Sequence, residues 1–307
     1  MASIYNQIHN ALLPDGSLPD GFSLPQLTAG SYKFYSGEFD GLCLYHYDPE
    51  HRNISLLKKA LEQAAAGSFE EAKENLAKAF VQDELGRPKT PMIMAYGDVQ
   101  KWAGKHTSDL QTNAMADFLK DLLLAAENIS SLKLALVLLP SLAPDLVAEY
   151  KGELLTIGSC DEFTYFVILL LQSVYGAEAN EAIFQLAQRT HGWGRIHAVK
   201  ALEPATEEIR RWLLLEGCHN TVNPNYSALV VAEKIDLAGL VTSDLTEEEF
   251  IAAGYILKAL AEEDPMVGLS SYDGGDELVE KYVKKAKKYK GDSEIKKLVK
   301  NIKEAME

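Results

Sequence analysis

Cysteine is scarce in this chain of 307 residues, which contains three: Cys43, Cys160 and Cys218. They are odd in number, lie far apart and never follow a Cys-x-x-Cys spacing. A disulfide framework usually needs an even number of cysteines, and disulfides are rare in the reducing cytoplasm. We therefore expect free thiols and a cytoplasmic protein.

Long hydrophobic runs are also missing. The most apolar stretches, residues 132–139 and 163–171, fall far short of the ~20 residues that a membrane-spanning helix requires. The first residues lack the basic start and the apolar run of a secretory signal peptide. The sequence therefore predicts a chain without a membrane span. Its hydrophobic content of 47% is ordinary for a globular protein.

The familiar sequence signatures of catalysis are absent as well. The chain has no Gly-x-Ser-x-Gly, no Walker-type Gly-x-x-x-x-Gly-Lys-Ser/Thr and no His-Glu-x-x-His. Gly192-Trp193-Gly194 lacks the later glycine of a phosphate-binding loop. Cys160 precedes a predicted helix, where thiol pKa values fall, but the apolar surroundings of a buried helix keep a thiol inert. We expect no cofactor and favour a non-enzymatic function.

Positive charge is in short supply, since the net charge is −15. The basic residues are concentrated at the end of the chain, where residues 280–307 hold ten lysines against five acidic residues. The net charge of this segment is +5, so the rest of the chain has a net charge of −20. Such an acidic body repels phosphate backbones, so a nucleic-acid partner is disfavoured.

Residues 1–50 are rich in proline and glycine, which excludes long helices after the first dozen residues. Aromatic and apolar residues then alternate around Ser36-Gly37 and Asp40-Gly41, from Tyr32 and Phe34 to the segment 42–47. This pattern indicates a small β-hairpin, and an extended aromatic arm packed on helices is the alternative.

From residue 53 onward, apolar stripes at helical spacing recur every 15 to 20 residues, with short joints between them. This cadence predicts an all-α fold, either an α-solenoid of the HEAT or armadillo kind or an irregular helical array. Residues 86–91, GRPKTP, are the best candidate boundary. We therefore expect an N-terminal part, residues 1–90, and a helical-repeat domain, residues 91–307, capped by the lysine-rich helices.

The densest repeat-like unit is residues 191–217, HGWGRIHAVKALEPATEEIRRWLLLEG, two predicted helices that meet at Pro204. Arg195, Ala198, Ala201 and Leu202 resemble the arginine and small-apolar pattern of HEAT repeats. The wider run 161–237 resembles an uncharacterised bacterial family with such a helical domain. Some members carry the label "limonene hydroxylase", but no residues here support monooxygenase chemistry. The resemblance implies a fold and no established activity.

The same segment supplies the candidate binding residues. Trp193, Arg195 and His197 could face a groove and hold a carboxylate or a peptide, or they could fill and satisfy the interface between repeats. The candidates that we expect at a protein- or peptide-binding site are His191, Trp193, Arg195, His197, Asn223 and Tyr226.

Other functions stay open beside this one. An enzyme or small-ligand protein would place a pocket near Trp193–Tyr226, where Trp, His, Arg and Asn residues are concentrated. His191, His197, Cys218 and His219 include good zinc ligands, but their spacing matches no known ligand frame, so we expect no metal. The negative net charge outside the lysine-rich end argues against a HEAT-like DNA glycosylase, which must bind a phosphate backbone. The same negative charge is compatible with an immunity protein.

Overall fold

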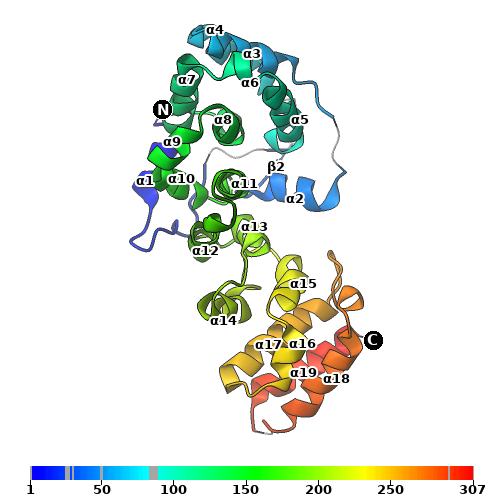
Figure 1. Ribbon diagram of the computed structural model, residues 1–307. Helices are drawn as coiled ribbons and strands as arrows, with labels where there is room; N and C mark the ends of the chain where they lie inside the picture. Colours follow the sequence, from blue (N-terminus) through cyan, green and yellow to red (C-terminus); the bar gives the residue numbers. More distant parts are fainter. Residues whose placement is uncertain are drawn as a thin grey trace. The chain divides into compact units, whose positions relative to one another are not determined.

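The computed structural model describes residues 2–24, 28–29, 31–48, 51–82, 89–289 and 291–306. Helices make up most of these residues, so the all-α class is confirmed (Figure 1). Tertiary contacts divide the chain into unit 1, Met1–Arg195, and unit 2, Ile196–Glu307. Part of the predicted boundary at residues 86–91 lies outside the described residues, so that boundary stays a prediction.

Unit 1 consists of short helices that pack in pairs. Sequence neighbours such as α3 and α4, or α7 and α8, lie against each other, which is the arrangement of helical hairpins. In order, the helices are α1 (Ile4–Ala11), α2 (Glu38–His46), α3 (Ser55–Ala65), α4 (Phe69–Ala79), α5 (Met92–Lys105), α6 (Thr107–Leu110), α7 (Asn113–Ala125), α8 (Ile129–Leu142), α9 (Pro144–Glu149), α10 (Lys151–Gly158), α11 (Thr164–Tyr175), the 3-10 helix η1 (Gly176–Ala179) and α12 (Asn180–Arg189).

The centre of unit 1 is formed by α8 and α11, which pack against each other and against α5, α7 and α10 (Figure 1). Both helices are apolar around most of their circumference, and a helix without a polar face is usually buried. The buried side chains of α11 include Phe166, Val167 and Leu171, as expected for this run. Helix α8 is also largely apolar, and its one charged residue, Lys133, is buried.

The predicted hairpin is only partly correct. Strands β1 (Thr28–Ala29) and β2 (Tyr32–Lys33) pair in antiparallel fashion, with Ala29 opposite Tyr32. The expected second strand near residues 42–47 is instead helix α2. Its start is favoured by Gly37, which adopts a left-handed φ of 74°, and by two carboxylates in the first turn. Helix α2 packs against α5.

Helix α13 (Trp193–Ala201) contains the division between the two units. The remaining helices of unit 2 are predominantly amphipathic, and the lysine-rich last two bury Tyr282 and Ile302. They are α14 (Glu207–Glu216), α15 (Asn225–Lys234), α16 (Leu237–Thr242), α17 (Glu247–Ala261), the 3-10 helix η2 (Leu269–Ser271), α18 (Gly275–Ala286) and α19 (Ser293–Ala305).

Helix α17 is the centre of unit 2 and packs against α14, α15 and α19. Phe250 stacks on Tyr282 with a centroid separation of 4.4 Å, and the Tyr282 hydroxyl donates a hydrogen bond to the Phe250 carbonyl. Thr246 and Glu249 form a capping box at the start of this helix. Among the described residues, no helix has the length and apolarity needed to cross a membrane.

Candidate functional site

The six residues predicted for a binding site are divided between the two units. His191, Trp193 and Arg195 belong to unit 1, and the others belong to unit 2. His191 is exposed and Asn223 is half-buried. The remaining four are buried: Trp193, Arg195, His197 and Tyr226.

Trp193 occupies the interior of unit 1, where 4% of its surface is exposed. Its indole lies against the backbone of Gly41 in α2, so closely that a Cβ atom at residue 41 would enter the ring. The Tyr45 ring, one turn later on α2, lies 5.8 Å from the indole centroid. The tryptophan therefore joins α2 to the start of α13.

The half-buried carboxylate of Asp161 stabilises the same region. It accepts hydrogen bonds from the backbone N–H groups of Gly192, at 3.2 Å, and Gly194, at 2.6 Å. Burial raises the pKa of Asp161 to about 6, against the opposing effect of these donors. Beside it, Arg195 donates its Nε–H to the Ala187 carbonyl at 3.1 Å. These contacts give Trp193 and Arg195 definite roles within unit 1.

Among the predicted residues of unit 2, His197 has a neutral side chain and Asn223 has a local structural role. Burial lowers the pKa of His197 to about 3, so its imidazole is neutral at physiological pH. The Asn223 side-chain oxygen accepts the N–H of Asn225 at 3.0 Å, and its own N–H donates to the Asn220 side chain at 2.8 Å. Asn223 therefore shapes the turn that leads into α15.

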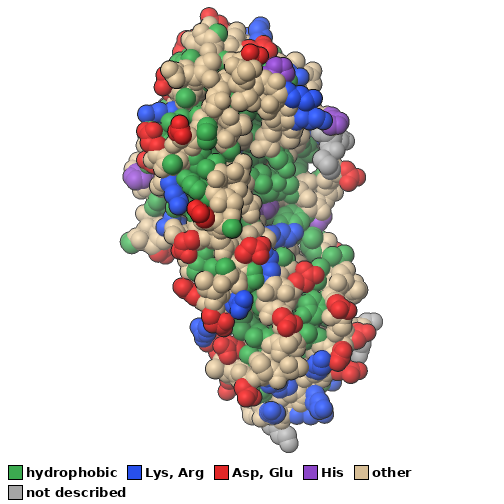
Figure 2. All heavy atoms as spheres, in the orientation of Figure 1, with side chains coloured by type: hydrophobic (Ala, Val, Ile, Leu, Met, Phe, Trp, Pro, Cys, Tyr) green, Lys and Arg blue, Asp and Glu red, His purple; other side chains and the backbone are tan. Residues whose placement is uncertain are grey.

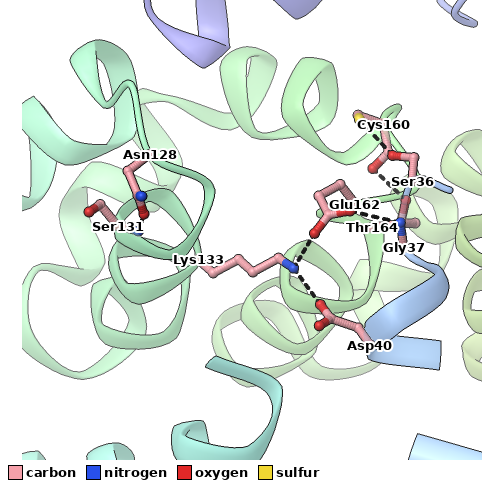
Figure 3. A network of polar contacts seen from close by, with 9 residues as sticks. All are labelled: Ser36, Gly37, Asp40, Asn128, Ser131, Lys133, Cys160, Glu162 and Thr164. Atoms are coloured by element: carbon pink, nitrogen blue, oxygen red, sulfur yellow. Dashed lines mark hydrogen bonds and ion pairs between the residues drawn. The ribbon is translucent and has the colours of Figure 1, made fainter. Parts of the chain in front are cut away.

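A buried ion cluster in unit 1 had no counterpart in the sequence predictions (Figure 3). Lys133 extends from α8 between Asp40 of α2 and Glu162, which precedes α11 (Figure 3). Its Nζ atom lies 2.5 Å from each carboxylate, Asp40 Oδ2 and Glu162 Oε1. The second Glu162 oxygen accepts the Gly37 N–H at 2.8 Å. Three segments distant in sequence meet at this cluster.

The chemistry of the cluster is that of a fixed cation. Burial lowers the pKa of Lys133, but the two carboxylates outweigh burial and hold the pKa above its ordinary value. Burial and the charge of Glu162 raise the pKa of Asp40 to about 6. Burial also raises the pKa of the nearby Cys160 thiol to about 12, although Ser36 Oγ lies 3.5 Å from its sulfur. A charged lysine and a neutral thiol are weak nucleophiles at physiological pH.

A cavity of about 860 Å³ lies in unit 2, where the ends of α17 and α19 meet the start of α18. The segment between α17 and α18 forms much of its wall. Apolar and acidic residues both line it: Ala261, Glu263, Asp264, Leu269, Ser270, Tyr272, Gly274, Gly275, Asp276, Glu277, Ala305 and Met306.

Four of these lining residues are carboxylates, and no lining residue is Lys, Arg or His. Glu277 forms an ion pair of 2.9 Å with Lys281, which lies outside the lining. Glu263 accepts hydrogen bonds from the backbone N–H and the hydroxyl of Ser270. The acidic side chains, like Ser270 and Met306, are exposed, so the cavity opens to solvent.

The wall of the cavity is fixed from inside by Asn225 of α15, which is buried. Its amide Nδ2 donates to the carbonyls of Glu262 and, at 3.0 Å, Asp264. The Tyr272 hydroxyl accepts the Ala238 N–H at 3.2 Å. The sequence of residues 262–275 does not reveal this wall, because the partners of Asp264 and Tyr272 lie 39 and 34 residues away.

On the face shown in Figure 2, acidic side chains occur over both units, with basic side chains among them. Within the described residues, no group of three or more His, Cys, Asp or Glu side chains is placed to hold a metal ion. Comparison with protein-family models, with curated proteins and with solved structures finds no match to this chain.

Proposed function

We propose that this all-helical chain is a non-enzymatic protein that binds another protein or a peptide, and that its helical hairpins form a HEAT-like or irregular array. The binding site that we propose is the cavity of unit 2. It differs from the groove that the sequence suggested around Trp193. We prefer the cavity because Trp193 and Arg195 are buried, and a buried side chain offers little surface to a partner.

The observation that carries this proposal is the cavity itself. A volume of about 860 Å³ is within the usual range for ligand sites. Its rim is exposed, and its lining combines apolar groups with carboxylates. An open, mixed surface of this kind suits a segment of polypeptide, whereas substrate pockets of enzymes bury most of a small ligand.

The state of the reactive groups also favours binding over catalysis. Burial raises the pKa values of Cys43 to about 11 and of Cys160 and Cys218 to about 12. None of these thiols is activated, and Lys133 is held as a cation. These pKa values support a function that requires no nucleophile.

A site-specific photo-crosslinker tests the proposal. Benzoylphenylalanine is introduced at Met306, which lines the cavity and is 44% exposed. The control position is Val222, which is 38% exposed and lies outside the lining. Irradiation in extracts of the native cell should give a discrete protein adduct from position 306 only, identifiable by mass spectrometry. The same adducts from both positions, or none from position 306, would contradict the proposal.

A further inference from the structure

We propose, on the basis of the function above, that the cavity of unit 2 takes up an arginine or lysine side chain presented by a peptide segment of the partner. The recognised group is a cation carried on an apolar stem.

The charge of the lining is negative throughout. It contains Glu263, Asp264, Asp276 and Glu277, and none of the other lining residues carries a positive side chain. Helices α17 and α19 also end here, at Ala261 and Ala305, and helix C-termini carry partial negative charge.

The start of α18 contributes partial positive charge at the same cavity, which by itself would attract an anion. Its first turn, however, already contains Asp276 and Glu277. Two carboxylates beside the N-terminus offset the helix dipole and repel a second anion. The electrostatic balance of the cavity therefore selects a cation.

The four carboxylates differ in their availability. Glu277 is paired with Lys281, and Glu263 accepts two hydrogen bonds from Ser270. For Asp264 and Asp276, the described part of the chain supplies no side-chain hydrogen bond or ion pair. These two carboxylates are the groups that can accept hydrogen bonds from a guanidinium or an ammonium group.

Apolar surface also lines the cavity. Ala261 and Leu269 are buried, Tyr272 is half-buried and Met306 is exposed at the rim. Lysine and arginine bury their methylene stems against such surface while the charged end meets polar groups. A tyrosine ring also attracts a cation placed over its face. A metal ion or a small inorganic cation would leave this apolar surface without a partner.

The wall that carries Asp264 is held in place before any ligand binds. Asn225, which is 5% exposed, donates to the carbonyls on either side of residue 263. Its Oδ1 atom is buried and has no hydrogen-bond partner among the described residues, so the amide orientation is set by those two carbonyls. A wall fixed in this way reduces the entropy that binding would otherwise cost.

Fluorescence anisotropy with defined peptides tests the inference on the full chain. The probe is a labelled heptapeptide of glycine and serine with one central arginine. The matched control contains citrulline, which has the same shape without the charge. The arginine peptide should bind at least about fivefold more tightly, the upper range for an exposed ion pair, and the difference should shrink at high salt.

Variants of the protein localise the effect. Asp264→Asn and Asp276→Asn should each weaken the arginine peptide by about threefold to fivefold, as expected for partly exposed pairs. Glu280→Gln removes the same charge from an exposed residue of α18 outside the lining, and should leave affinity unchanged. Circular dichroism of each variant establishes that the helices are intact.

The outcomes separate the two proposals. Equal binding of the arginine and citrulline peptides overturns the inference, and so does equal weakening by Glu280→Gln. If agmatine alone binds as tightly as the peptide, the occupant is a small amine and the peptide is refuted. Crosslinking from position 306 that persists in the Asp264→Asn/Asp276→Asn double variant refutes cation recognition but leaves the proposed function intact. Loss of any crosslink in the unaltered chain refutes both.

Discussion

Replacement of Lys133 by methionine should destabilise unit 1 strongly. Methionine keeps most of the length of the lysine stem and removes its charge. Asp40 and Glu162, which are 5% and 9% exposed, would then be buried carboxylates without a cation. Breaking a buried ion pair from one side costs about 3–5 kcal/mol. At about 2–4 °C per kcal/mol for a unit of this size, the melting temperature should fall by about 10 °C.

The matched control removes the whole cluster. In Lys133→Met/Asp40→Asn/Glu162→Gln, no charge remains, and the glutamine oxygen can still accept the Gly37 N–H. Removing every charge of a buried ion cluster avoids the cost of an unpaired buried charge, although buried amides still need hydrogen-bond partners. The triple variant should therefore regain part of the lost stability.

Urea denaturation followed by tryptophan fluorescence measures both variants. The chain has three tryptophans, and Trp212→Phe leaves Trp102 and Trp193, both in unit 1, as the reporters. A loss below about 1 kcal/mol for the single variant would show that the carboxylates are solvated. A triple variant as unstable as the single one would show that unpaired carboxylate charge is not the source of the loss.

Two further predictions concern a cap and a pH dependence. Thr246→Ala removes the acceptor at the start of α17 and should cost about 1 kcal/mol in urea denaturation, whereas Thr221→Ala, at an exposed position without a cap, should cost nothing measurable. Asp161 has a folded pKa of about 6, above its ordinary value, so its contribution to stability is complete below about pH 4 and is lost as pH rises through 6. Asp161→Asn keeps an oxygen that can accept the N–H groups of Gly192 and Gly194. This variant should reduce the change in unfolding free energy between pH 4 and 7 by at most about 3 kcal/mol. An unchanged pH dependence would contradict the assignment.

The helices were predictable because their signals are local. The spacing of apolar residues indicated most of the elements from α3 onward, and the cap at Thr246 was found from four residues of sequence. The same reasoning fails where a residue distant in sequence determines the local structure. Ser68 and Glu71 have the same spacing as a capping box, yet α4 begins there without a side-chain cap hydrogen bond. The short helix α16 was missed because its six residues contain too little periodicity.

The sites were less predictable than the helices. Lys133 lies within the apolar stretch LKLALVLL, and a lone charge in such a run is a sign of a buried partner. No local pattern identifies that partner, because Asp40 is 93 residues away. For Trp193 and Arg195 the sequence left two interpretations open, a binding groove and the interface between repeats. Their burial depends on α2 and α12, whose positions periodicity does not supply.

The close approach of Gly41 and Trp193 has a consequence for how this sequence can evolve. A Cβ atom at residue 41 would overlap the indole, so neither position can change freely while the other stays fixed. Among relatives of this chain, a larger residue at position 41 should therefore occur only with a smaller residue at position 193. Paired substitution at these two positions would indicate that the contact between α2 and α13 is retained, even in relatives whose surrounding sequence has diverged.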